Sequence, residues 1–259
     1  LEGEGGGVRS EGLTFLIERI ENEPTWLWYA RQDGWAQHSW RLAQWRSTAG
    51  NLGGLEERLL KVVCEALRKD LESREQRNRI VYVRHSSYFW EQKKDDFARV
   101  AEEVLARKKT SGAAVLYIAQ YLYHGLDLYD RAIAVLLEAH QEKRLEEGGQ
   151  AQLVVYLQDR KRFAESIPVL EPLIQSRPGN INYRCQLMHA FFQTGKEESM
   201  RACLKKADAD FHAAKLWNES TISSLAQACV LNKLFPEAVA YCEELIPLHQ
   251  RTQPNRGIG

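Results

Sequence analysis

Side chains that could act as nucleophiles, general bases or metal ligands are spread thinly along this 259-residue chain. The seven histidines stand singly, and no two have the i, i+4 spacing that places two imidazoles on one helix face for a metal ion. The five cysteines include no Cys-x-x-Cys pair. We therefore expect no metal site and no cofactor. These residues are His38, His85, His124, His140, His189, His212 and His249, with Cys64, Cys185, Cys203, Cys229 and Cys242.

One short stretch brings a base close to two hydroxyl groups. His85 precedes Ser86 and Ser87 and could form a nucleophile–base pair with one of them. The same residues suit a helix N-cap with local hydrogen bonds, which is the interpretation we favour. No GxGxxG follows a predicted strand, and the GxxxxGK[ST], GxSxG and HExxH motifs are absent from the sequence. The sequence therefore predicts that the chain is not an enzyme.

Residues 25–46 hold five of the seven tryptophans. Trp28, Arg31 and Trp35 would share one face of a helix, and exposed there they could stack on a sugar, a base or a partner's side chain. Alternatively, these rings pack in the core against residues 15–17 or against the helix that follows. We favour burial because large aromatic side chains dominate core packing, and we keep the three residues as a candidate aromatic surface.

The charge balance argues against nucleic-acid and membrane partners. Thirty-five Lys and Arg residues balance 35 Asp and Glu residues, so no basic excess is available for phosphates or anionic lipids. The longest apolar runs, such as residues 113–119, are far shorter than the roughly 20 residues of a membrane-spanning helix. Unpaired, scattered cysteines are typical of a reducing compartment, so we expect a cytoplasmic protein.

The elements that must position any functional residue are predicted to be helices. Apolar residues recur at three- and four-residue spacings from Leu13 onward, including a long helix over residues 55–74. Residues 80–83 are the exception, a β-branched run that fits a short strand or a connector. We expect four parts: a flexible lead-in (1–12), a Trp-rich helical region (13–86), helical repeats (87–250) and a polar tail (251–259). Leu1 at the start and the polar tail suggest a piece of a longer protein.

An apolar pattern repeats through the second half of the chain. Tyr129-x-x-Ala132-Ile133-x-x-Leu136-x-x-Ala139 recurs at residues 163–173 and again at 197–207, a step of 34 each time (163 − 129 and 197 − 163). A further copy, residues 235–245, is displaced by 38, so we expect a four-residue insertion near residues 212–218. A weaker copy, residues 97–104, precedes the first by 32.

The repeat resembles the tetratricopeptide repeat (TPR), a helix–turn–helix unit of 34 residues. The matching positions are Ala132, Ala139, Pro178, Gly195 and Ala207, and the departures are Ser166, Leu173, Glu197 and Met200. The resemblance implies an all-α fold, a right-handed superhelical solenoid of antiparallel helix pairs. It also implies a concave groove lined by the first helix of each pair.

The repeat frame indicates which residues would line that groove. One first helix would contribute Asn182, Cys185, His189, Phe192 and Gln193, and the next would contribute Ser220, Ser223, Gln227, Val230 and Leu231. Family members that clamp a peptide's terminal carboxylate use Lys, Asn and Arg at these places. That set is missing here, which argues against a clamp for a chain terminus and leaves open a mixed polar–aromatic groove for an internal peptide segment.

The family resemblance therefore implies a non-enzymatic scaffold that binds a peptide or protein partner. One alternative is a structural spacer or assembly module, in contact with flanking domains of the same polypeptide. Another is the regulatory repeat region of an enzyme whose catalytic domain lies outside this segment. Architecture alone does not choose among these hypotheses.

Overall fold

The computed structural model of this chain describes residues 94–106 and 110–252. It also describes single helical residues at positions 15, 18, 19, 22, 57, 60, 61, 64, 65, 68 and 71. Over these residues the chain consists of helices and short turns, with no strand, which confirms the all-α prediction. Trp28, Arg31, Trp35 and residues 80–87 lie outside the described part, and the predicted domain boundaries stay predictions. The chain divides into two compact units, Leu1–Leu145 and Glu146–Gly259.

The described helices of the first unit begin with α6 (Lys94–Ala106), which matches the weakest copy of the repeat. Its apolar side is buried: Phe97, Val100 and Val104 are 0–5% exposed. Glu103, on the outer side of α6, pairs with Arg68 at 2.7 Å. Because Arg68 and the other described residues between positions 57 and 71 are helical, they agree with the long helix predicted there.

A helix pair completes the described part of this unit. It consists of α7 (Gly112–Gln120), its π-helical continuation η3 (Tyr121–Gly125) and α8 (Tyr129–Gln141). Ser111 caps α7 by accepting a hydrogen bond from the backbone N–H of Ala114. The next residue is Gly112, where a Cβ would lie 1.9 Å from the carbonyl oxygen of Arg144. A glycine is required at this close approach of two backbones.

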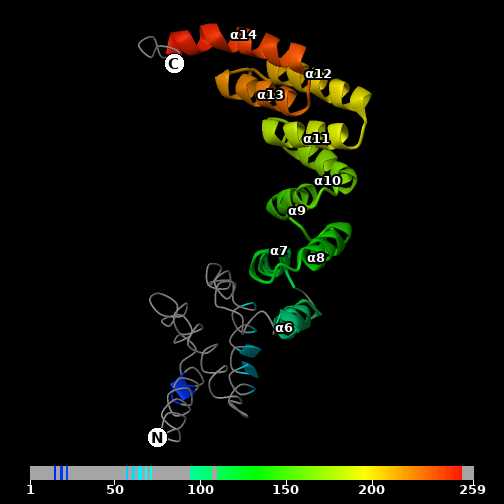
Figure 1. Cartoon of the computed structure of the whole chain (residues 1–259), viewed down its shortest axis with the longest axis vertical. Helices are drawn as coiled ribbons and strands as arrows, with labels where there is room; N and C mark the ends of the chain where they lie inside the picture. The colour runs from blue at the N-terminus through cyan, green and yellow to red at the C-terminus, as the bar shows by residue number, and fades with distance from the viewer. Residues whose placement is uncertain are drawn as a thin grey trace, which may run out of the picture. The chain divides into compact units, whose positions relative to one another are not determined.

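The second unit contains three successive helix pairs (Figure 1). The helices are α9 (Glu147–Asp159), α10 (Phe163–Ser176), α11 (Ile181–Gln193), α12 (Glu197–Ala213), α13 (Glu219–Leu231) and α14 (Phe235–Thr252). The second helices begin at Phe163, Glu197 and Phe235, which are the first residues of the predicted copies of the repeat. First helices α11 and α13 begin behind equivalent N-caps, where the side chains of Asn180 and Asn218 accept backbone N–H groups.

The predicted insertion lies where the sequence placed it. Helix α12 has 17 residues against 14 in α10, so three of the four extra residues lengthen the helix. The fourth lengthens the connection to the next pair, which runs over residues 214–218 rather than the four residues 177–180. The three extra residues of α12 begin with Phe211, which is 2% exposed, so the insertion adds a buried aromatic ring to the core.

The turns inside the pairs repeat the same backbone geometry. Lys161, Gly195 and Lys233 all adopt a left-handed conformation, with φ of 59°, 71° and 59°. The N–H of each following residue donates back to a carbonyl five residues earlier, as in the bond of 2.9 Å from Lys196 to Phe191. This Schellman arrangement ends the first helix and turns the chain into the second. Gly195 is the one residue of the three that adopts this φ without steric cost.

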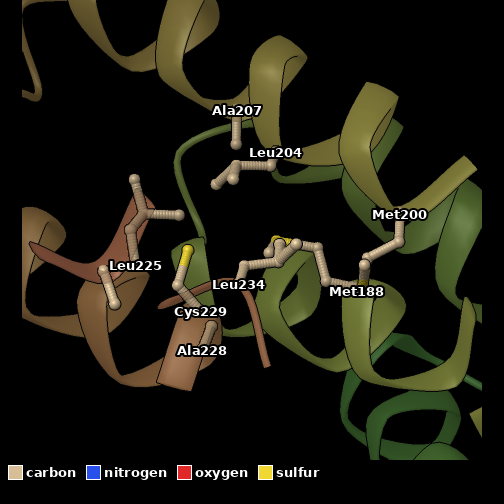
Figure 2. Packing of buried hydrophobic residues seen from close by; sticks show 9 residues of the cluster. Met188, Met200, Leu204, Ala207, Leu225, Ala228, Cys229 and Leu234 are labelled. Carbon is tan, nitrogen blue, oxygen red and sulfur yellow. The ribbon is translucent and has the colours of Figure 1, made fainter. Parts of the chain in front are cut away.

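The core follows the repeat pattern. Leu153, Leu187 and Leu225 occupy one position in successive first helices and are 0%, 7% and 0% exposed. Small side chains lie where two helices approach closely, as Ser166 does at 0% exposed, and larger ones such as Leu170 fill the space between helices. Figure 2 shows the part of this core that joins the last two pairs. It contains Met188, Met200, Leu204, Ala207, Leu225, Ala228, Cys229, Leu234 and Ala238.

Candidate functional site

The predicted groove residues lie on first helices α11 and α13, which pack against each other. We call them the first-helix row: Asn182, Cys185, His189, Phe192 and Gln193 of α11, with Ser220, Ser223, Gln227, Val230 and Leu231 of α13. The spacing of three and four residues puts each set along one side of its helix. The two sets thus lie on neighbouring helices, and their side chains range from partly buried to exposed.

Several side chains of the row are exposed. Asn182, Gln193 and Gln227 are exposed, so their carboxamides can donate and accept hydrogen bonds. Val230 and Leu231 are 52% and 68% exposed, which is high for aliphatic side chains. The row thus presents neutral hydrogen-bonding groups next to an apolar end.

His189 is the best-connected residue of the row. Its Nδ1 lies 2.9 Å from Oδ1 of Asn232, at the C-terminal end of α13. Because a carboxamide oxygen can only accept, Nδ1 carries the proton and donates. The imidazole also meets the ring of Phe163 edge-on, with centroids 5.4 Å apart. His189 therefore joins α10, α11 and the turn between α13 and α14.

Asn232 was not predicted as a site residue. It is 2% exposed, and its Nδ2 has no hydrogen-bond partner among the residues that the structure describes. The sequence signal that could have found it is its place between the last residue of a first helix and the left-handed turn residue, where Asn often ends helices. Its contact with His189, 43 residues earlier, has no such local signal.

Phe192 also meets the turn of the following pair. The ammonium group of Lys233 lies 5.9 Å from the centre of the Phe192 ring, a cation–π distance. Lys233 is exposed and occupies the left-handed turn position. A positive charge thus lies at the edge of a row that carries none of its own.

Cys185 is placed differently from the other members of the row. Its thiol packs against the core cluster and lies 3.7 Å from the carbonyl oxygen of Ser224. Burial, with the nearby thiols Cys203 and Cys229, raises the pKa of Cys185 to about 12. Burial likewise raises the pKa of Cys203 to about 11 and that of Cys229 to about 12. All three stay protonated at neutral pH and are poor nucleophiles.

Two polar side chains near the row, Arg184 and Gln158, bond to other helices. Arg184 is 3% exposed, and its guanidinium donates to a carboxylate oxygen of Asp210. This bond ties α11 to the extended end of α12. Gln158 of α9 donates to the carbonyl oxygen of Gln186 at 3.1 Å and so ties α9 to α11. The Arg184 bond thus joins the two helices of one pair, and the Gln158 bond joins two successive first helices.

The described part of the chain contains neither a cluster of metal ligands nor a helix that could span a membrane. Within it, no group of three or more His, Cys, Asp or Glu side chains is arranged to hold a metal ion. None of the helices described here has the length and apolar character needed to cross a membrane. The candidate aromatic surface of Trp28, Arg31 and Trp35 falls outside these residues.

Comparisons with known proteins gave structural likeness alone. No family model and no curated protein matches the sequence. Among solved structures, MamA MSR-1 C2 is 16% identical and has a TM-score of 0.43, over 67% of this chain and 98% of its own. A Podosopora anserina putative kinesin light chain with nearly identical TPR-like repeats is 20% identical, with a TM-score of 0.47 over 69% of this chain and 99% of its own. Helix pairs that recur at the predicted step, with the same turn and the same buried positions, give this chain a TPR-like all-α fold.

Proposed function

We propose that this chain is a non-enzymatic scaffold that binds an internal segment of a protein partner along the first-helix row. The observation that carries the proposal is the pairing of exposed carboxamides with exposed apolar side chains on adjacent helices α11 and α13. Gln193 and Gln227 suit the hydrogen-bonding groups of a peptide backbone. Val230 and Leu231, at 52% and 68% exposed, suit apolar side chains of the same peptide.

The charge of the row favours an internal segment over a chain terminus. The row contains no Lys, Arg, Asp or Glu, so it has no group to neutralise a terminal carboxylate or ammonium. Lys233, beside Phe192, adds one cation at the edge of the row. The ligand expected is therefore a mixed polar and apolar segment, with an acidic residue placed to meet Lys233.

The absence of a reactive group supports a binding role over catalysis. The thiols nearest to the row have raised pKa values because they are buried. His189 uses its Nδ1 in the bond to Asn232 and lies against Phe163, which suits a supporting role. None of these groups is paired as a nucleophile with a base. The groups of the row suit contact with a ligand better than reaction with one.

Selection of peptides from a random library displayed on phage, with the full chain as bait, tests the proposal. Selected peptides should bind the wild-type chain, and Leu231→Asp or Gln227→Arg should weaken them at least tenfold. The control is Ala202→Asp, which adds a charge at an exposed position of α12 outside the row. Failure to enrich any peptide, or equal affinities for the row variants and the control, would contradict the proposal.

A further inference from the structure

Helix α14 carries an uncovered apolar row on one face. We call Phe235, Val239, Cys242 and Ile246 the α14 face. Their spacing of i, i+4, i+7 and i+11 aligns them along one side of the helix. Phe235, Val239 and Ile246 are 58%, 56% and 48% exposed, and Cys242 is exposed too. Apolar side chains aligned in this way usually mark a contact surface.

The equivalent row of α10 is covered. Phe163 touches His189 of α11, and Ile167 and Leu170 are 8% and 0% exposed. Helix α10 packs between α9, the first helix of its own pair, and α11, the first helix of the next pair. Helix α14 has the counterpart of α9, namely α13, but the described residues include no counterpart of α11. Ile167 is buried where α11 packs on α10, and Val239 is exposed where the described residues include no such neighbour.

Helix α12 differs from α10 and α14 because it carries a charged residue in this row. At the position of Ile167 and Val239 it carries Arg201, which pairs with Glu197 and Glu237. A charged side chain with two carboxylate partners can stay in solvent at that position. Helix α14 retains an apolar side chain there, although a charged one would suit an exposed surface better.

The α10–α11 contact indicates what kind of element would cover the α14 face. Tyr183, Leu187 and Ala190 of α11 recur at i, i+4 and i+7, are buried, and lie outside the cluster that α11 shares with α12 and α13. They form a narrow apolar stripe that ends in a small residue. On α14, Glu243 is exposed beside the apolar row, so a basic side chain at the edge of the incoming helix would be favoured.

We propose that the α14 face docks an amphipathic helix of a partner protein. The helix would carry apolar residues at i, i+4 and i+7, with a small side chain at the last position and a Lys or Arg facing Glu243. The proposal goes beyond the function proposed above, because the α14 face shares no residue with the first-helix row. Either surface can fail its test without affecting the other.

A peptide with the sequence of residues 180–196 is the probe, since it contains the α11 stripe and the basic Lys196. A hydrocarbon staple replaces Ile181 and Cys185, which pack toward the core cluster in the native chain, and keeps the peptide helical. Binding of the labelled peptide to the full chain is measured by fluorescence anisotropy. Val239→Glu and Ile246→Glu should each raise the dissociation constant at least tenfold. Ala240→Glu, at an exposed position on another side of α14, is the matched control and should leave it unchanged.

A second measurement needs no substitution. Cys242 is the one exposed cysteine of the five, so the peptide should slow its alkylation by iodoacetamide several-fold. The proposal is overturned if the wild-type chain does not bind the peptide, if the Glu variants bind as well as the control, or if bound peptide leaves Cys242 unprotected. A dimer in sedimentation that Ile246→Glu dissociates would identify a second copy as the occupant, and this too would overturn it.

Discussion

His189 donates from Nδ1 to Oδ1 of Asn232 over 2.9 Å and so ties α11 to the end of α13. The two residues are 43 positions apart in sequence, and Asn232 is almost fully buried. The bond satisfies a polar group that would otherwise lie unpaired at the junction of two helix pairs. It therefore helps to set the register of the last two pairs.

Replacing Asn232 by Ala should destabilise the chain by about 1–3 kcal/mol, because the partly buried Nδ1–H of His189 would lose its acceptor. Urea unfolding followed by circular dichroism measures the change. His189→Ala combined with Asn232→Ala should cost less than the sum of the two single changes, since the bond is lost once. Additive losses would show that the bond does not couple the two residues.

Two glycines form a matched pair for testing backbone strain. A Cβ would meet nothing within 4 Å at either Gly195 or Gly148, but Gly195 has a φ of 71° and Gly148 lies within α9. Gly195→Ala should therefore destabilise by about 1–2 kcal/mol, whereas Gly148→Ala should stabilise by about 0.5–1 kcal/mol. Thermal unfolding of the two variants measures both signs. A loss of similar size in both would contradict the strain argument.

Gly112 tests the close approach of two backbones in the first unit. Gly112→Ala would place a Cβ 1.9 Å from the carbonyl oxygen of Arg144, so the backbone must shift. We expect a loss of about 1–3 kcal/mol from overpacking, measured by urea unfolding. Gly148→Ala again serves as the control. A neutral result for Gly112→Ala would mean that the start of α7 can move away from residue 144 at no cost.

The buried thiols predict a loss of stability in alkali. The pKa of Cys185 is raised from 9.0 to about 12 in the folded chain. The stability that this thiol contributes is therefore fully present below pH 9 and is lost as the pH rises toward 12. Between these two pH values the Cys185 thiol is deprotonated in the unfolded chain but stays protonated in the folded chain. The slope is about 1.4 kcal/mol per pH unit for each such thiol.

Urea unfolding at a series of alkaline pH values measures this slope. Cys185→Ala should flatten it relative to the wild-type chain, whatever its effect on stability at neutral pH. Cys229→Ala, in the same cluster, should do the same because its folded pKa is also raised to about 12. Parallel curves for the variants and the wild-type chain would show that these thiols do not contribute.

The sequence alone determined the helix pairs, their register and much of their core. Small side chains at a repeat position allow neighbouring helices to approach closely, and large ones fill the space between them. The repeat pattern therefore assigns Ala132, Leu136 and Ser166 to the interior. All three are 0% exposed. The turns also recur with the repeat: Lys161 and Lys233, at the positions equivalent to Gly195, adopt the same left-handed conformation. The location of the insertion followed from the change in step.

Only the tertiary structure decided the identity of the contacts between pairs. The first-helix row was predicted from periodicity, which specifies the side of a helix but not what another helix places against it. The thiol of Cys185 consequently turned out to pack on the core, and His189 to bond to an asparagine from the next pair. The exposure of the α14 face has the same origin: a helix face is buried or free according to its neighbour, and the neighbour is not encoded in the helix itself.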